Sequence, residues 1–138
     1  MPRRRIRIPT PSEGTATLCL GGIVASAGSA QASSCTIKKW HYTGSYKCGT
    51  TVLSADWTGN GSVDEVFVVA PNRHIWHVWK NAGGWKEMPG GGRADNMSGY
   101  TFWDGVERCV TVRVNSSPHY YQNCFYSGTW HNWTVAGG

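Results

Sequence analysis

The chain alternates between apolar runs and turn residues in the way that short β-strands do. Residues 65–70 (EVFVVA) form a continuous apolar run, which predicts a strand covered on both faces. Residues 71–73 (PNR) predict a turn, and residues 74–80 (HIWHVWK) predict an aromatic strand. A Gly turn at 81–84 leads to a third short strand at 85–88, and we find no helical period in this part. The pattern predicts an all-β fold made of antiparallel sheets.

This arrangement recurs about 45 residues further along the chain. The equivalent positions are Trp40/Trp85/Trp130, Ile75/Tyr120, Trp76/Tyr121, Phe67/Val112, Val69/Val114 and Gly83/Gly128. The second unit predicts strands at 110–114, 120–125 and 130–135, while the Gly-rich residues 90–98 predict a flexible loop. A period of about 45 residues with several short strands is typical of blade-like sheets. We expect the recurring tryptophans in the cores of these sheets.

Residues 1–32 have the features of a cleaved export signal. Four arginines precede a modest apolar stretch at 15–27, and residues 30–32 (AQA) supply a small-x-small cleavage pattern. A short buried helix or a membrane anchor is the alternative, but a span needs about 18 or more apolar residues. The sequence predicts a signal peptide at 1–32 and an extracellular, secreted β-repeat domain at 33–138, without a membrane association.

Without this leader the charge nearly disappears. Residues 33–138 contain nine Lys or Arg against seven Asp or Glu, so the formal net charge of +5 for the whole chain falls to +2. Charged residues make up only 15% of the chain, which excludes a coiled coil and a charged disordered tail. No Lys/Arg cluster remains to release counterions, so we expect no nucleic-acid partner. Eight Trp, six Tyr and three Phe all lie after the leader.

Four cysteines remain after the leader: Cys35, Cys48, Cys109 and Cys124. An even number of cysteines in an exported chain predicts two disulfides. Three connectivities are open, of which the sequence-local one closes two loops of about a dozen residues, each stabilising by about 3 kcal/mol. A zinc site is the alternative, although the chain has no CxxC pair.

Residues 54–70 (SADWTGNGSVDEVFVVA) resemble the opening of an FG-GAP/VCBS repeat, the blade of integrin-type β-propellers. The recurring Gly-Trp endings also resemble tachylectin- and tectonin-like lectin propellers. The resemblance implies two blades over residues 54–138, with Trp40 ending a partial blade before them. A closed propeller needs at least four blades. Because the chain supplies only about two blades, three arrangements are open: copies of the chain assemble, a partner covers the open side, or the two sheets pack on each other as a sandwich. We favour a small compact β fold.

The loop 56–64 has oxygen-bearing side chains at positions 1, 3, 5 and 9 and Gly at position 6, a spacing that wraps Ca²⁺. The FG-GAP resemblance implies Asp56, Asn60 and Asp64 as calcium ligands, assisted by Thr58 and by the Ser62 carbonyl. Thr58 replaces the usual acidic or amide residue, and Phe67 stands where a bidentate Glu is usual. The alternative is an Asx-rich turn that holds no ion.

No motif for a catalytic nucleophile occurs, and we expect no enzyme activity. His74 and His77 form an HxxH, but on a strand this spacing sends them to opposite faces, so they make a poor metal pair. The functional signal therefore lies in the aromatics, whose flat apolar faces suit both sugars and protein partners. Trp57, Trp103 and Trp133 stand near predicted loops and are the candidates for a binding surface.

Trp40, His41 and Tyr42, flanked by Cys35 and Cys48, resemble the Trp-Arg-Tyr turn of tendamistat-like α-amylase inhibitors, with His41 in place of the arginine. This resemblance implies these three residues as an inhibitory contact. The sequence as a whole predicts a secreted, non-catalytic binding module for carbohydrate. The alternative is a protein-interaction role, as a hydrolase inhibitor or an adaptor in a secreted, toxin-like assembly. We expect the partner to be a glycan or another secreted protein. The chain could also form an oligomer or a hetero-complex.

Overall fold

The computed structural model describes residues 32–137, and all of its regular elements are β-strands. The predicted signal peptide, apart from Ala32, lies outside the described residues. No helix in this part of the chain is long and apolar enough to cross a membrane. The strands are β1 (Ser34–Lys39), β2 (Tyr42–Lys47), β3 (Leu53–Ala55), β4 (Glu65–Val69), β5 (Ile75–Trp79), β6 (Lys86–Glu87), β7 (Asn96–Trp103), β8 (Glu107–Arg113), β9 (Tyr120–Tyr126), β10 (Thr129–Trp130) and β11 (Thr134–Val135).

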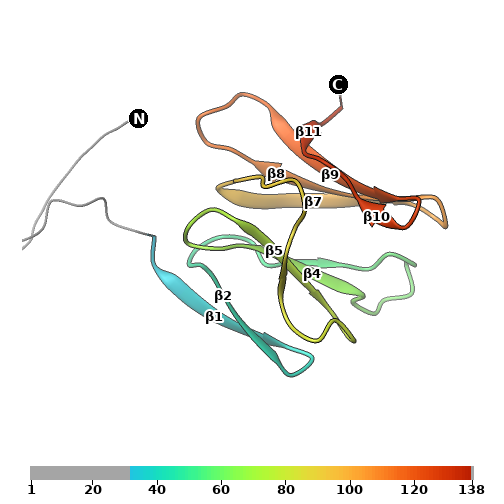
Figure 1. The fold of residues 1–138 in the computed structure, drawn as a ribbon, viewed down its shortest axis with the longest axis horizontal. Helices are drawn as coiled ribbons and strands as arrows, with labels where there is room; N and C mark the ends of the chain where they lie inside the picture. Colours follow the sequence, from blue (N-terminus) through green and yellow to red (C-terminus); the bar gives the residue numbers. More distant parts are fainter. Residues whose placement is uncertain (1–31, 138) are drawn as a thin grey trace, which may run out of the picture. The chain divides into compact units, whose positions relative to one another are not determined.

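The strands form a hairpin and two sheets, all antiparallel. β1 pairs with β2, and β3-β4-β5-β6 make a first sheet with neighbours in chain order. A second sheet, β7-β8-β9-β10, repeats the same order, and β11 also pairs with β9. Figure 1 shows these three groups in cyan, green and orange. The fold is thus all-β with two similar four-stranded units, and the described strands close neither a barrel nor a ring of blades.

The first sheet is covered on both faces, as the apolar run at 65–70 predicts. All five residues of β4 are buried. Phe67 and Val69 belong to a core that includes Val110 and Val112 of the second sheet. Val66 and Val68 point to the opposite face, where β4 contacts β2 of the hairpin. Burying each of these side chains stabilises the fold by roughly 1.5–3 kcal/mol.

The two sheets do not match residue for residue at a spacing of 45. Phe67 faces the second sheet, whereas Val112, its predicted equivalent, faces the first sheet. Val66 and Val68 face the hairpin, which precedes the first sheet, and Val110 and Val112 face the first sheet, which precedes the second. Residues of β4 and β8 that play the same part are therefore 44 positions apart. A one-residue shift exchanges the two faces of a strand. The repeat therefore predicts strand order correctly but assigns the faces of β8 wrongly.

The outward faces of the stack are mostly polar, apart from exposed aromatic residues such as Tyr120. On the hairpin, Thr36, Lys38 and Ser45 are exposed, while the alternate positions are half-buried against the first sheet. On the second sheet, Thr111 and Arg113 alternate with the buried Val110 and Val112. Polar outward faces and apolar inward faces are what a finished stack of layers needs. This arrangement corresponds to the sandwich alternative rather than to an open propeller.

Strand β7 is missing from the sequence prediction, which places a flexible loop at 90–98. The register between β7 and β8 shifts between Met97 and Gly99, so Ser98 is an extra residue in the ladder. Such a bulge breaks the alternation of apolar and polar residues that identifies a strand. Residues 88–95 form the connection between β6 and β7, and Arg93 in it forms an isolated antiparallel β-bridge with His74.

The recurring tryptophans occupy unequal environments. Trp130 packs on the core against Phe67 and Phe125, with ring centroids 5.7 and 5.4 Å away. Trp85 packs instead against Gly44 of the hairpin and donates a hydrogen bond from Nε1 to the Tyr42 carbonyl at 3.2 Å. Trp40 lies in the hairpin turn, so it is not the blade-core residue that the repeat predicts.

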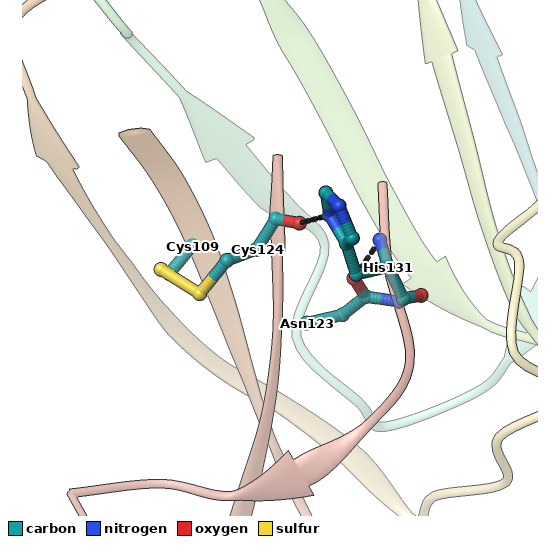
Figure 2. The surroundings of a disulfide bond; sticks show 4 residues. All are labelled: Cys109, Asn123, Cys124 and His131. Atoms are coloured by element: carbon teal, nitrogen blue, oxygen red, sulfur yellow. Dashed lines mark hydrogen bonds between the residues drawn. A yellow bond between two sulfur atoms is a disulfide. The ribbon is translucent and has the colours of Figure 1, made fainter. Parts of the chain in front are cut away.

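The disulfides follow the sequence-local connectivity. Cys35 pairs with Cys48 and brackets the β1–β2 hairpin. Cys109 pairs with Cys124, directly opposite it in the β8–β9 ladder. Figure 2 shows the second bond beside His131, whose Nδ1 lies 3.1 Å from the Cys124 carbonyl oxygen. Two disulfides in so small a domain are typical of extracellular proteins.

Asp95 links residues from three parts of the fold. Its carboxylate accepts two hydrogen bonds from Arg73, at 2.9 and 3.2 Å, and one from the backbone N–H of Asn115 at 2.8 Å. Lys47 of the hairpin lies 3.9 Å away. Desolvation raises the pKa of Asp95, but the Arg73 and Asn115 hydrogen bonds and the charges of Arg73 and Lys47 outweigh it. They hold the pKa below the ordinary value of 3.8.

This lowered pKa predicts acid sensitivity. A carboxyl group whose pKa is lower in the folded state stabilises the protein above its unfolded pKa, and this contribution disappears as pH falls through the folded pKa. We expect the stability gap between the wild-type protein and Asp95→Asn to narrow as pH falls from about 6 to about 3, measured by urea unfolding. Arg73→Met should reduce the same acid dependence. A gap independent of pH would contradict the role of Asp95.

Candidate functional site

A groove opens between the two sheets, near the loop 56–64 and the tips of the β7–β8 and β9–β10 hairpins. We call it the inter-sheet groove; it consists of two hollows that share Trp57, Thr58, Arg108 and Phe125. The sheet hollow, of about 410 Å³, is also lined by Asp64, Glu65, His77, Trp79 and Trp130. The tip hollow, of about 290 Å³, is also lined by Phe102, Tyr126 and residues 103–107 and 127–128. Aromatic walls with a few polar groups are typical of ligand sites.

A buried carboxylate organises the wall of the sheet hollow. Glu65 begins β4 and is only 6% exposed. One of its oxygens accepts a hydrogen bond from Trp57 Nε1 at 2.9 Å, and the other lies 2.6 Å from His77 Nδ1. A buried carboxylate needs such partners to offset its desolvation. Glu65 therefore fixes both the Trp57 indole and the His77 ring.

The tryptophan in this network is a core residue. Trp57 follows β3 in a loop but is only 4% exposed, because the loop folds back and the Trp57 N–H donates to Asp64 Oδ2 at 2.8 Å. Its ring meets Tyr100 and Phe67 edge to face, at centroid distances of 5.2 and 6.1 Å. The prediction that Trp57 is exposed near a loop is thus wrong, although its ring edges the groove.

Arg108 brings a cation to the groove from β8. In the sheet it stands between Phe102 of β7 and Phe125 of β9. Its guanidinium carbon lies 5.6 Å from the ring centre of Trp57 and 5.5 Å from that of Phe125. Among residues 32–137 no carboxylate forms an ion pair with it. Stacking on two rings orders the guanidinium while leaving its N–H edge free.

Exposed aromatics gather at the tip hollow. Trp103 is 69% exposed, and Phe102 and Tyr126 are each slightly more than 40% exposed. Tyr126 stacks on His131, with ring centroids 3.7 Å apart. Exposed clustered aromatics of this kind are unusual for a surface without a binding role. Trp103 is thus exposed at a hairpin tip, and its binding role stays a prediction.

The loop 56–64 is held by its own side chains. Both oxygens of Asp56 accept backbone N–H bonds, from residues 58–60 and, at 2.7 Å, from Gly61. Asn60 Oδ1 accepts the N–H of Ser62 at 2.9 Å. Desolvation raises the pKa of Asp56, but the four backbone donors outweigh it and lower this pKa below 3.8. The geometry is that of the Asx-rich turn, and calcium binding stays a prediction that this arrangement does not test.

One further group of side chains that could bind a metal ion occurs in the described part of the chain. Glu107, Cys109 and Cys124 have ligand atoms within 4.8 Å of one another. The two cysteines are joined in a disulfide and offer no thiolate. This group is therefore no basis for a metal centre.

The remaining predicted residues lie away from the inter-sheet groove. Trp133 packs on Gly92, and its Nε1 is the one buried side-chain donor without a partner among residues 32–137. Trp40 and His41 form the two-residue turn of the β1–β2 hairpin. Tyr42 begins β2, and its hydroxyl oxygen accepts the N–H of Gly83 at 3.1 Å. The predicted binding aromatics thus form three separate surfaces.

Three residues of the groove were missed by the sequence analysis: Glu65, His77 and Arg108. The HxxH spacing correctly separates the histidines, since His74 bonds Glu87 at the surface while His77 is 4% exposed. In the β4–β5 ladder Glu65 is opposite Trp79, so His77, two residues before Trp79, lies on the same face as Glu65. The hairpin predicted at 65–80 was therefore a usable signal for this pair. For Arg108 no signal was available, since its ring contacts join distant segments.

Comparisons with known proteins found no relatives. No family model, no curated protein and no solved structure matches this chain.

Proposed function

We propose that the chain is a secreted, non-catalytic binding protein that holds a carbohydrate in the inter-sheet groove. The single observation that carries this proposal is the position of Trp103. It is 69% exposed and stands at the tip hollow, which is continuous with the sheet hollow through four shared residues. Paired cysteines and the leader-like residues 1–32 support the secreted location.

The groove supplies both kinds of contact that a sugar needs. Its indole and phenyl faces suit the C–H face of a pyranose ring. Its polar groups, Asp64, Glu107 and Arg108, suit hydroxyl groups, because carboxylates accept and guanidinium groups donate hydrogen bonds.

Trp103→Ala is the test of this site. We expect the wild-type protein to bind oligosaccharides from a glycan array, and the variant to lose about thirtyfold in affinity, the loss typical of a central aromatic anchor. Because Trp103 is largely exposed, the variant should keep its stability. The measurement is titration of tryptophan fluorescence with the best array ligands.

Trp40→Ala is the matched control, since Trp40 lies at the hairpin turn and outside the groove. It should leave sugar affinity unchanged. If the wild-type protein binds no saccharide, or if both variants bind as it does, the groove is not a carbohydrate site.

A second candidate function rests on the hairpin turn. Trp40 and His41 both have positive φ, 47° and 72°, a conformation that bulky residues avoid and that Asn-Gly usually supplies. The Cys35–Cys48 bond brackets this hairpin and helps to hold it in place. Strain kept at an exposed turn often accompanies a contact with a partner. This supports the inhibitor alternative, in which a secreted hydrolase is slowed by wild-type protein and Trp103→Ala but not by Trp40→Ala.

A further inference from the structure

We infer that the inter-sheet groove selects saccharides that bear a carboxylate, with Arg108 as the residue that pairs with it. This inference rests on the proposed carbohydrate function and names its ligand class. The guanidinium lines both hollows and is held between the rings of Trp57 and Phe125. It has no ion-pair partner within the described part of the chain.

The free edge of this guanidinium defines the chemistry of its partner. A planar fork of N–H groups matches the two oxygens of a carboxylate in a bidentate pair. Arg108 is an exposed residue of β8, and its two ring contacts keep the guanidinium beside the groove. A sugar ring carrying a carboxylate would stack on the aromatic walls while its acid group meets Arg108.

A second observation places a polar group deeper in the sheet hollow. His77 lines this hollow and is only 4% exposed. Its Nδ1 is occupied by Glu65, while its Nε2 has no hydrogen-bond partner among residues 32–137. His77 Nε2 can bond a ligand hydroxyl that enters the sheet hollow, and the Asp64 carboxylate, which also lines this hollow, can bond another.

The other charges of the groove do not compete for Arg108. Glu65 is engaged by Trp57 and His77, and Asp64 Oδ2 accepts the Trp57 N–H. Asp104 and Glu107 also line the tip hollow, but neither forms an ion pair with Arg108. The guanidinium is therefore the cation that an incoming acid group meets.

The experiment compares three soluble probes: oligogalacturonate, the same oligosaccharide after chemical reduction of its carboxyl groups, and a sulfated glucan. We expect the wild-type protein to bind oligogalacturonate about tenfold to a hundredfold more tightly than the reduced form, the range expected for charge-assisted hydrogen bonds. Arg108→Met keeps an apolar stem against the rings and should abolish this preference. The readout is calorimetric affinity.

Arg113→Met is the matched control, because it removes the same charge from the opposite face of the same strand. It should keep the preference for the carboxylate. Equal affinity for the acidic and reduced probes, equal losses in the two variants, or equally tight binding of the sulfated glucan would each overturn the inference. Binding of the neutral probe alone would leave the carbohydrate function standing, whereas binding of no probe and no array glycan would refute both.

Discussion

Replacing Glu65 with alanine should lower the free energy of unfolding by about 3–5 kcal/mol, the cost of removing one partner from a buried pair. The substitution leaves His77 Nδ1 and Trp57 Nε1 without an acceptor in a region that is less than 10% exposed. It also leaves a space where the side chain stood. Urea unfolding followed by tryptophan fluorescence measures this loss.

Glu87→Ala is the matched control, since Glu87 makes the same kind of bond to a histidine at the surface. His74 Nδ1 lies 2.7 Å from Glu87 Oε2, but the Glu87 side chain is 37% exposed. We expect this variant to lose at most about 1 kcal/mol. Similar losses for the two variants would show that the buried network does not hold the groove together.

Asn123→Ala should destabilise the protein by about 3 kcal/mol, because several backbone groups lose their partner at once. Asn123 is fully buried in β9. Its side chain donates to the carbonyls of His131 and Pro89, at 2.7 and 3.2 Å, and accepts the His131 N–H at 2.9 Å. Figure 2 shows Asn123 and His131 facing each other across this network. The bonds tie the chain after β10, and the loop after β6, to the second sheet.

Asn132→Ala removes the same side chain from an exposed neighbouring position and should change stability by no more than about 0.5 kcal/mol. Asn123→Asp keeps the acceptor but loses both donated bonds, so its loss should also be large. A fully stable Asn123→Ala protein would mean that water replaces the amide without cost.

The sequence predicts the features of this fold that depend on local pattern. The apolar run from Glu65 to Val69 identifies a strand covered on both faces. The 45-residue period identifies two similar units of three strands each, to which the structure adds β3 and β7. The even number of cysteines predicts two disulfides but leaves their connectivity open. These features are encoded within segments of a few to about a dozen residues, which is the range over which residue periodicity is informative.

The inter-sheet groove depends on which faces meet, and this is not a local property. A shift of one residue between β4 and β8 decides that Val112 and Phe67 face each other, and so which residues line the groove. Trp57 looks exposed by its position near a glycine-rich loop, but its hydrogen bond to Glu65 draws it into the core. Arg108 gains its role only through rings from two other segments.

The polar outer layers limit how this protein could lengthen. A tandem duplication that added a third four-stranded unit would set new aliphatic side chains against Thr111, Arg113 and Gln122 of the present surface. Their hydroxyl, guanidinium and amide groups would lose water without gaining partners. Adding a further unit therefore requires these positions to become apolar first. The polar outer faces thus oppose any extension of the stack beyond two units and a hairpin.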